Sequence, residues 1–223
     1  MKNKTRMIID ISMTVLLPLL MAYSLIGEKF HEIAGTAIFV LFIIHHILNQ
    51  KWYGALFKGK YNTRRAFQTA LDLVLLVFMI LQPVSGILMS KHLYTFLPAF
   101  PVSAWARSVH MLLAYWGYTL LSIHAGTHLI APFRKLYGKN RKLFVTICVI
   151  LGCISAYGCA AFVRRGFPGY MSGKTAFAFF DYSEPRVFFF MDYIAIMILF
   201  MATGCLIMYG LGRINTKRKA VKK

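Results

Sequence analysis

The chain has 223 residues, of which 58% are hydrophobic and 15% are charged, and its mean hydropathy is +0.60. A soluble domain of this length would need far more charge, so the composition excludes a soluble globular protein and indicates an integral membrane protein. The net charge of +19 could suit a nucleic-acid-binding protein, but the distribution of the basic residues argues against that class.

Six apolar segments, each of roughly 19 to 25 residues, are long enough to cross about 30 Å of hydrocarbon. The sequence therefore predicts an all-α integral membrane protein with six transmembrane helices. Because the connections between them are too short for a soluble domain, we expect residues 1–223 to form a single membrane domain. The predicted spans are Met7–Ile26, His31–Asn49, Phe67–Ser90, Trp105–Ile130, Leu143–Val163 and Val187–Leu211.

The basic residues gather on one side of the predicted membrane. Nineteen of the 26 Lys and Arg residues lie in segments 2–6, 51–65, 134–142 and 213–223, which an order of six spans places together. By the positive-inside rule that side is the cytoplasm, so both termini are expected there. Basic tails of this kind meet anionic lipid head groups. We therefore expect a multi-pass protein of the cytoplasmic membrane, in contact with the lipid bilayer and with no nucleic acid.

The first two spans carry an acidic residue and a pair of histidines. Asp10 lies near the cytoplasmic start of the first span, where its carboxylate is expected to complement the helix dipole or to pair with a nearby Lys or Arg. His31 and His45 lie fourteen residues apart in the second span. Fourteen residues of α-helix leave two side chains about 40° apart on one face and about 21 Å apart along the axis. One helix face therefore presents two separate imidazoles.

The third and fourth spans repeat this arrangement. Asp72 lies near the cytoplasmic start of the third span and is expected to act as Asp10 does, and Pro83 is expected to kink or loosen that helix. His110 and His124 lie fourteen residues apart in the fourth span, each 79 residues after its counterpart in the second. Seven histidines in a chain of this length would give only about 0.2 such pairs by chance. The repeat suggests that one helix hairpin was duplicated.

Facing histidines on two helices are axial ligands of haem iron in electron-transfer proteins, where both axial positions are filled. Spans two and four run in the same direction, so His31 would meet His110 (the outer pair) and His45 would meet His124 (the inner pair). The sequence has no CxxCH motif for covalent haem attachment. The pattern predicts a cytochrome b-like four-helix bundle, formed by residues 1–130, that holds two haem b groups through these four histidines.

Zinc is a weaker interpretation of the histidines. Two ligands about 21 Å apart on one helix cannot share one ion. His124 and His128 are spaced to share one, but no Cys or carboxylate near them in the sequence completes the set. His128 and His46 are interpreted either as quinone-contacting or supporting residues near the inner haem, or as interfacial histidines bonded to backbone or lipid. His46 could also replace His45 as the inner ligand.

Small and basic residues near the histidines suit bound haem. Gly35 and Gly117 would let a flat ring approach the helix backbone, although close packing of helices explains Gly117 equally well. Lys91 and Arg107 are placed to contact the propionates of the outer haem through charge-assisted hydrogen bonds.

Residues 131–223 are expected to add two further transmembrane helices and an outer loop. Four Cys lie in these two spans without a CxxC motif, and we interpret them as small hydrophobic residues that fill space. Asp192 and the aromatic loop before it either form a docking or quinone surface or serve packing.

Several stretches around the histidines are similar to one bacterial family. They are HEIAG (31–35), HHILN (45–49), WY (52–53), FKGKY (57–61), VSGIL (84–88), the run from His110 through Tyr115-Trp116-Gly117 to His124 and His128, FFDY (179–182) and DY (192–193). Taken together, the chain resembles the flavinylation-associated membrane cytochromes. The resemblance covers nearly the whole chain and is most specific at the paired histidines.

This resemblance implies electron transfer between the membrane quinone pool, with menaquinol or another quinol as donor, and flavin-carrying proteins outside a bacterial cytoplasmic membrane. It also supports His31, His45, His110 and His124 as haem ligands. The chain has no flavin-attachment motif, so the extracytoplasmic flavoprotein is expected to be a separate partner. The chain would then be a quinol-oxidising subunit of an oxidoreductase.

Two functions of other classes fit the same histidines. A proton or ion transporter that uses a histidine relay would also place histidines in transmembrane helices. A non-haem membrane anchor subunit of a redox complex would need a quinol site and partner contacts but no haem.

Overall fold

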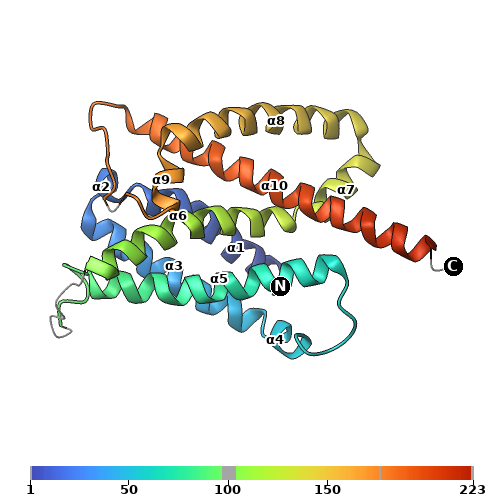
Figure 1. Ribbon diagram of the computed structural model, residues 1–223, viewed down its shortest axis with the longest axis horizontal. Coiled ribbons are helices and arrows are strands. Elements are labelled where there is room, and N and C mark those ends of the chain that lie inside the picture. Colours follow the sequence, from blue (N-terminus) through green and yellow to red (C-terminus); the bar gives the residue numbers. More distant parts are fainter. Residues whose placement is uncertain (1, 97–103, 176, 222–223) are drawn as a thin grey trace. The chain divides into compact units, whose positions relative to one another are not determined.

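The computed structural model of the protein describes residues 2–96, 104–175 and 177–221 (Figure 1). In this part of the chain all regular structure is helical and no strand occurs, which confirms the predicted all-α class. The helices, in chain order, are α1 (Lys2–Met21), α2 (Tyr23–Ile26), α3 (Glu28–Leu48), α4 (Lys51–Ala55), α5 (Thr63–Leu88), α6 (Ala104–Thr127), α7 (Ile130–Lys139), α8 (Arg141–Arg164), α9 (Phe167–Met171) and α10 (Arg186–Val221).

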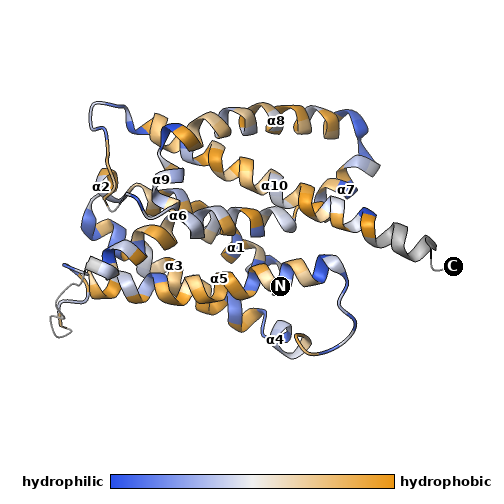
Figure 2. Cartoon of the chain, viewed as in Figure 1, coloured by the Kyte–Doolittle hydropathy of each residue, from blue (hydrophilic) through white to orange (hydrophobic). Residues whose placement is uncertain are grey.

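Four helices in the described part of the chain are long and apolar enough to cross a membrane. They are α3, α5, α8 and residues 186–214 of α10, which correspond to predicted spans two, three, five and six. Figure 2 shows hydrophobic residues along most of each of them. Helices α1 and α6 lie at predicted spans one and four, and α1 begins with the charged residues Lys4, Arg6 and Asp10. The count of six spans and the side of the termini stay predictions, and residues 222–223 of the predicted basic tail lie outside the described residues.

Local sequence sets several helix boundaries. The side chain of Asn140 accepts a hydrogen bond from the amide of Leu143 and so caps the start of α8. Gly27, with φ of 92°, separates α2 from α3, and Gly166, with φ of 68°, separates α8 from α9. Both adopt a positive φ that favours glycine. Helix α5 continues through Pro83, so this proline does not break the helix.

The chain divides into two compact units, which are described separately. The first unit contains Met1–Lys58, Leu76–Gly117 and Gly166–Met191. In this unit α1 packs along α3, and Ala34 and Ile38 of α3 are buried. Helix α9 lies against α6 through the stacked rings of Tyr115 and Tyr170, whose centroids are 4.0 Å apart. This unit contains His31, His45 and His110, the ligands predicted from α3 and from the first half of α6.

The helices of the second unit approach each other closely at glycines. This unit contains Gly59–Leu75, Tyr118–Arg165 and Asp192–Lys223. A Cβ atom added at Gly158 of α8 would overlap the backbone of Ala195 in α10, and one at Gly204 of α10 would overlap the backbone of Ile123 in α6. Figure 1 shows α8 and α10 running side by side. Glycine at these positions lets two helix backbones pack without a side chain between them.

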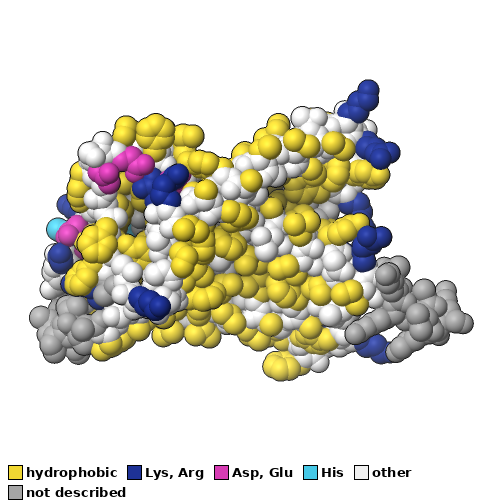
Figure 3. All heavy atoms as spheres, turned by 45° about the horizontal axis from the view of Figure 1, so that its top comes forward, with side chains coloured by type: hydrophobic (Ala, Val, Ile, Leu, Met, Phe, Trp, Pro, Cys, Tyr) yellow, Lys and Arg dark blue, Asp and Glu magenta, His cyan; other side chains and the backbone are white. Residues whose placement is uncertain are grey.

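Apolar side chains cover much of the visible helix surface (Figure 3). Large exposed hydrophobic residues occur on α1, α3, α5, α8 and α10, for example Ile47, Val77 and Leu206. A soluble protein rarely exposes so much contiguous apolar surface, whereas a membrane protein turns it towards lipid. The surface therefore agrees with the predicted membrane location.

Candidate functional site

The first unit brings together the two histidines of the outer pair. The imidazole rings of His31 in α3 and His110 in α6 have centroids 6.3 Å apart, and their planes are inclined by 69°. Tyr23 of α2 packs edge-on against the His31 ring at 5.1 Å. Residues that are 79 positions apart in the sequence are thus neighbours in one compact unit.

Hydrogen bonds around His110 determine which ring nitrogen carries the proton. The Ser85 hydroxyl donates its hydrogen to the Gln82 carbonyl oxygen at 2.9 Å, so its oxygen can only accept from His110 Nδ1, which lies 3.1 Å away. This arrangement favours the tautomer of His110 that carries its proton on Nδ1. The Gln82 side-chain amide lies 3.3 Å from His110 Nε2 and donates to its lone pair. Nε2 is thus the nitrogen of His110 that can bind a metal.

Polar atoms in the same cluster are buried without a hydrogen-bond partner. They are Nδ1 of His31 and Oε1 of Gln82. Buried polar atoms are almost always satisfied in folded proteins, and exceptions mark strain, function or a missing ligand. Gly86 adds close packing here, since a Cβ atom at this position would lie 3.3 Å from His110 Cε1. The outer pair is thus closely packed at Gly86, and one polar atom on α3 and one on α5 beside it have no hydrogen-bond partner.

A carboxylate next to His31 holds the segment that follows α5. Glu32 accepts hydrogen bonds from the Ser90 hydroxyl at 2.7 Å and from the backbone amides of Lys91, His92 and Leu93 at 2.9, 3.2 and 2.8 Å. This segment is therefore fixed to the start of α3, beside the outer pair.

The two cations predicted to contact propionates already have partners in the first unit. The Lys91 ammonium pairs with Glu28 at 3.1 Å, and the Arg107 guanidinium lies 5.1 Å from the ring centroid of Phe177 in a cation–π contact. Both side chains are accessible, but their role at propionates stays a prediction.

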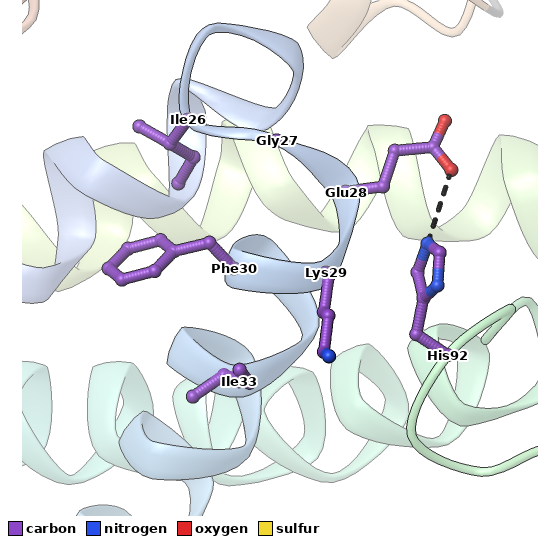
Figure 4. Close-up of a pocket in the computed structure, with 7 residues that line it drawn as sticks. All are labelled: Ile26, Gly27, Glu28, Lys29, Phe30, Ile33 and His92. Carbon is purple, nitrogen blue, oxygen red and sulfur yellow. Dashed lines mark ion pairs between the residues drawn. The ribbon is translucent and has the colours of Figure 1, made fainter.

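A shallow pocket lies at the start of α3. Figure 4 shows that it is lined by residues 26–30, Ile33 and His92, with His92 directed towards Glu28. Nε2 of His92 is 3.8 Å from the Glu28 carboxylate. The outer pair does not line this pocket.

Each histidine of the inner pair has a carboxylate beside Nδ1. In the first unit, Nδ1 of His45 is 2.7 Å from Oδ1 of Asp10. In the second unit, Nδ1 of His124 is 2.9 Å from Oδ1 of Asp72. Neither Asp lies in the first turn of its helix, where the helix dipole acts, and both face histidine on a neighbouring helix instead of Lys or Arg. The expected dipole role is therefore wrong. The structure does not place His45 and His124 relative to each other, since they belong to different units.

The neighbouring histidines have different partners. Nδ1 of His46 is 2.6 Å from the Tyr53 hydroxyl, and Phe42 packs edge-on against the His46 ring at 4.3 Å. The rings of His124 and His128 are 4.9 Å apart. Asp72 is a carboxylate near His124 that the sequence did not reveal. Even so, the described residues contain no group of three or more His, Cys, Asp or Glu that could hold a metal ion such as zinc.

The two glycines predicted to approach a ring differ in their surroundings. A Cβ atom at Gly35 would meet Leu20 Cδ2 at 3.9 Å, an ordinary van der Waals contact between α3 and α1. Gly117 is buried, yet a Cβ atom there would meet no atom within 4 Å. Close helix packing therefore does not account for Gly117.

Asp192, predicted to form a docking or quinone surface or to serve packing, is fully buried in the second unit. Its carboxylate accepts hydrogen bonds from Tyr157 at 2.5 Å, Arg164 at 2.5 Å and Arg165 at 2.7 Å. These contacts favour the packing role. The sequence analysis missed the two arginines, although an Arg pair at the end of an apolar span is a signal for a buried acidic partner.

The comparison with known families decides the class of the protein. The sequence model for prokaryotic cytochrome b561 matches residues 7–137, which include all four predicted ligands. The chain belongs to the prokaryotic cytochrome b561 family. Membership in this cytochrome b561 family implies transmembrane electron transfer by a b-type cytochrome, and its members bind haem b, typically two. The narrower resemblance to flavinylation-associated cytochromes stays a prediction. No curated protein and no solved structure is significantly similar to the chain.

Proposed function

We propose that this cytochrome b561 family member carries electrons across the membrane through two haem b groups, bound by His31 with His110 and by His45 with His124. Haem supplies reversible one-electron chemistry at iron, while the protein provides ligands, orientation and electrostatic environment. The observation that carries the proposal is the close approach of His31 and His110 in the first unit.

The separation of the outer histidines fits one haem iron between them. Two metal–nitrogen bonds of about 2 Å each, with about 1 Å more from each nitrogen to its ring centre, separate two axial imidazoles by about 6 Å. The His31 and His110 rings are 6.3 Å apart. The proton on His110 Nδ1 leaves Nε2 with the lone pair that a metal requires. Ser85 would thus orient His110, and the Gln82 amide would give way to iron.

Carboxylate partners favour His45 and His124 as the inner ligands. Metal-binding histidines commonly donate the second ring N–H to a carboxylate, which fixes the tautomer and orients the ring. Asp10 stands in this position beside His45 and Asp72 beside His124. His46 is paired with the Tyr53 hydroxyl instead. The pairing of His45 with His124 around one iron rests on the repeated sequence spacing.

We infer the electron donor and acceptor from the resemblance. Quinol in the membrane, such as menaquinol, would supply electrons, and an extracytoplasmic flavoprotein would accept them. His46 and His128 remain candidates for the quinone contact, because both lie beside an inner ligand in their own units. Two electrons and two protons leave each quinol, whereas each haem takes one electron at a time.

Visible difference spectra of the detergent-purified protein test the proposal, with haem quantified per chain. We expect b-type bands on reduction and about two haems per chain. His110→Ala should lose one haem, and the exposed histidine variant His92→Ala should retain both. At the inner site, His45→Ala should lose one haem and the adjacent His46→Ala should retain both.

Two results would overturn the proposal. Colourless, well-folded protein from haem-replete cells would contradict the cytochrome function and favour the transporter or the non-haem anchor subunit. Two haems retained in both His110→Ala and His45→Ala would show that other residues are the ligands.

A further inference from the structure

The inner and outer histidines differ in the charge of the group beside Nδ1. His45 and His124 each face a carboxylate oxygen, at 2.7 and 2.9 Å. His110 faces the neutral hydroxyl of Ser85 at 3.1 Å. Nδ1 of His31 is buried without a hydrogen-bond partner among the described residues.

Other charges near the outer pair are bonded elsewhere. The Glu32 carboxylate follows His31 in the chain, but it takes four hydrogen bonds from residues 90–93. Asp72 differs from it, since its buried Oδ1 lies 2.9 Å from Nδ1 of His124 but has no hydrogen-bond partner of ordinary geometry among the described residues.

A carboxylate beside Nδ1–H makes an imidazole a stronger electron donor to its metal. A stronger donor and a nearby negative charge both stabilise ferric over ferrous iron, so both lower the reduction potential. A neutral hydroxyl or a backbone group has a weaker effect. Four ligands of the same chemical type are thus divided by their neighbours into two electronic classes.

We propose that Asp10 and Asp72 are positioning residues that hold His45 and His124 through Nδ1 and set the reduction potential of the inner haem below that of the outer haem. This inference rests on the proposed function. The step that they bias is the transfer of one electron between the two irons, in which one is oxidised, the other is reduced, and no bond is made or broken. Electron flow from the inner to the outer haem is then downhill.

The positions of the two acids support a shared role. Asp10 lies in α1 and His45 in α3, and Asp72 lies in α5 and His124 in α6. In each predicted hairpin, the first long helix supplies the carboxylate and the second supplies the histidine. A carboxylate oxygen therefore lies close to Nδ1 of the histidine in each unit, in a hydrogen bond at His45 and in an ion-pair contact at His124.

Potentiometric titration of the purified holoprotein tests this inference. The wild type should show two components, and the His110→Ala variant should retain only the lower one, which assigns that component to the inner haem. Asp10→Asn and Asp72→Asn should each raise the midpoint potential of the lower component. We expect the equilibrium constant for its reduction to increase about tenfold, which corresponds to 59 mV for one electron. The upper component should stay unchanged.

Matched variants separate an electronic role from a structural one. Asp10→Glu keeps the negative charge and should leave the midpoint potential of the lower component near its wild-type value. Asp10→Ser and Asp72→Ser place a neutral hydroxyl beside the histidine, as Ser85 does at His110, and should raise this potential. Unchanged potentials in the Asn and Ser variants, or loss of the inner haem in all of them, would overturn the inference. A wild type with fewer than two haems would instead contradict the proposed function itself.

Discussion

Two buried polar clusters, one around Asp192 in the second unit and one around His110 in the first, differ in how completely their groups are bonded. Asp192 has three hydrogen-bond donors distributed over both carboxylate oxygens. Around His110, Ser85 and Gln82 form hydrogen bonds, but Oε1 of Gln82 and Nδ1 of His31 have no partner. Both clusters lie in apolar surroundings, where an unpaired polar atom is costly.

We interpret the Asp192 cluster as one that stabilises the fold and the His110 cluster as one arranged for the proposed haem. The Asp192 cluster is complete in the protein alone, and the helices beside it meet at Gly158 with no intervening side chain. In the outer pair, a contact of 3.3 Å from the Gln82 amide is the hydrogen bond at His110 Nε2, and two buried polar atoms beside it have no partner. We therefore expect substitutions in the first cluster to change stability and substitutions in the second to change the bound haem.

Asp192→Asn should have the largest effect on stability. The substitution removes the charge of a buried carboxylate that pairs with the largely buried Arg165, and breaking a buried ion pair costs about 3–5 kcal/mol. The change in stability is measured by thermal unfolding in detergent, with the loss of monodisperse protein as the readout. Asp181→Asn is the matched control, because Asp181 is exposed and accepts hydrogen bonds from its near neighbour Ser183. Equal unfolding temperatures for Asp192→Asn and Asp181→Asn would show that the Asp192 cluster does not stabilise the fold.

Gly158→Val should have an intermediate effect on stability. Its side chain would collide with the Ala195 backbone, and overpacking of this kind costs about 1–3 kcal/mol. Gly152→Ala lies on the same helix, where a Cβ atom meets nothing within 4 Å, and should be neutral or stabilising by up to about 1 kcal/mol. The same unfolding measurement compares them, and a tolerated Gly158→Val would mean that α8 and α10 can separate at little cost.

Gly86→Ala should have the smallest effect on stability and a specific effect on haem. The added methyl would lie 3.3 Å from His110 Cε1, so the ring must shift by a few tenths of an ångström while unfolding changes by less than about 1 kcal/mol. We expect a changed spectrum or potential of the outer haem only. Gly138→Ala, with nothing within 4 Å of its Cβ, should change neither. An unaltered outer haem in Gly86→Ala would indicate that the ring is not held from the α5 side.

The long helices could be predicted from the sequence because apolar runs determine them. The predicted span of residues 143–163 differs from α8 by two residues at its start and one at its end. The short helices α4, α7 and α9 lie between these runs, where no apolar periodicity marks them. Helix α2 lies at the end of the predicted span Met7–Ile26, which a turn at Ala22 divides in the structure. Helix α10 continues well past its predicted end at Leu211, because basic residues after an apolar span do not stop a helix.

The contact between His31 and His110 was predicted from spacing alone, whereas the carboxylate partners of the inner pair were not. Asp10 is 35 residues from His45, and Asp72 is 52 residues from His124, so no common spacing links acid to histidine. A carboxylate near the start of a helix has a sufficient local explanation in the helix dipole. The recurrence of one Asp in the first helix of each hairpin was the signal that could have revealed the contact.

Three of the four donors that Glu32 binds are backbone amides, those of residues 91–93. Such bonds do not depend on which side chains these residues carry, and proline alone would remove a donor. The segment beside the outer pair can therefore change its surface chemistry by substitution while its backbone keeps the same path. Residues 91–93 could therefore change in evolution to suit a new redox partner while His31, which precedes Glu32, keeps its position.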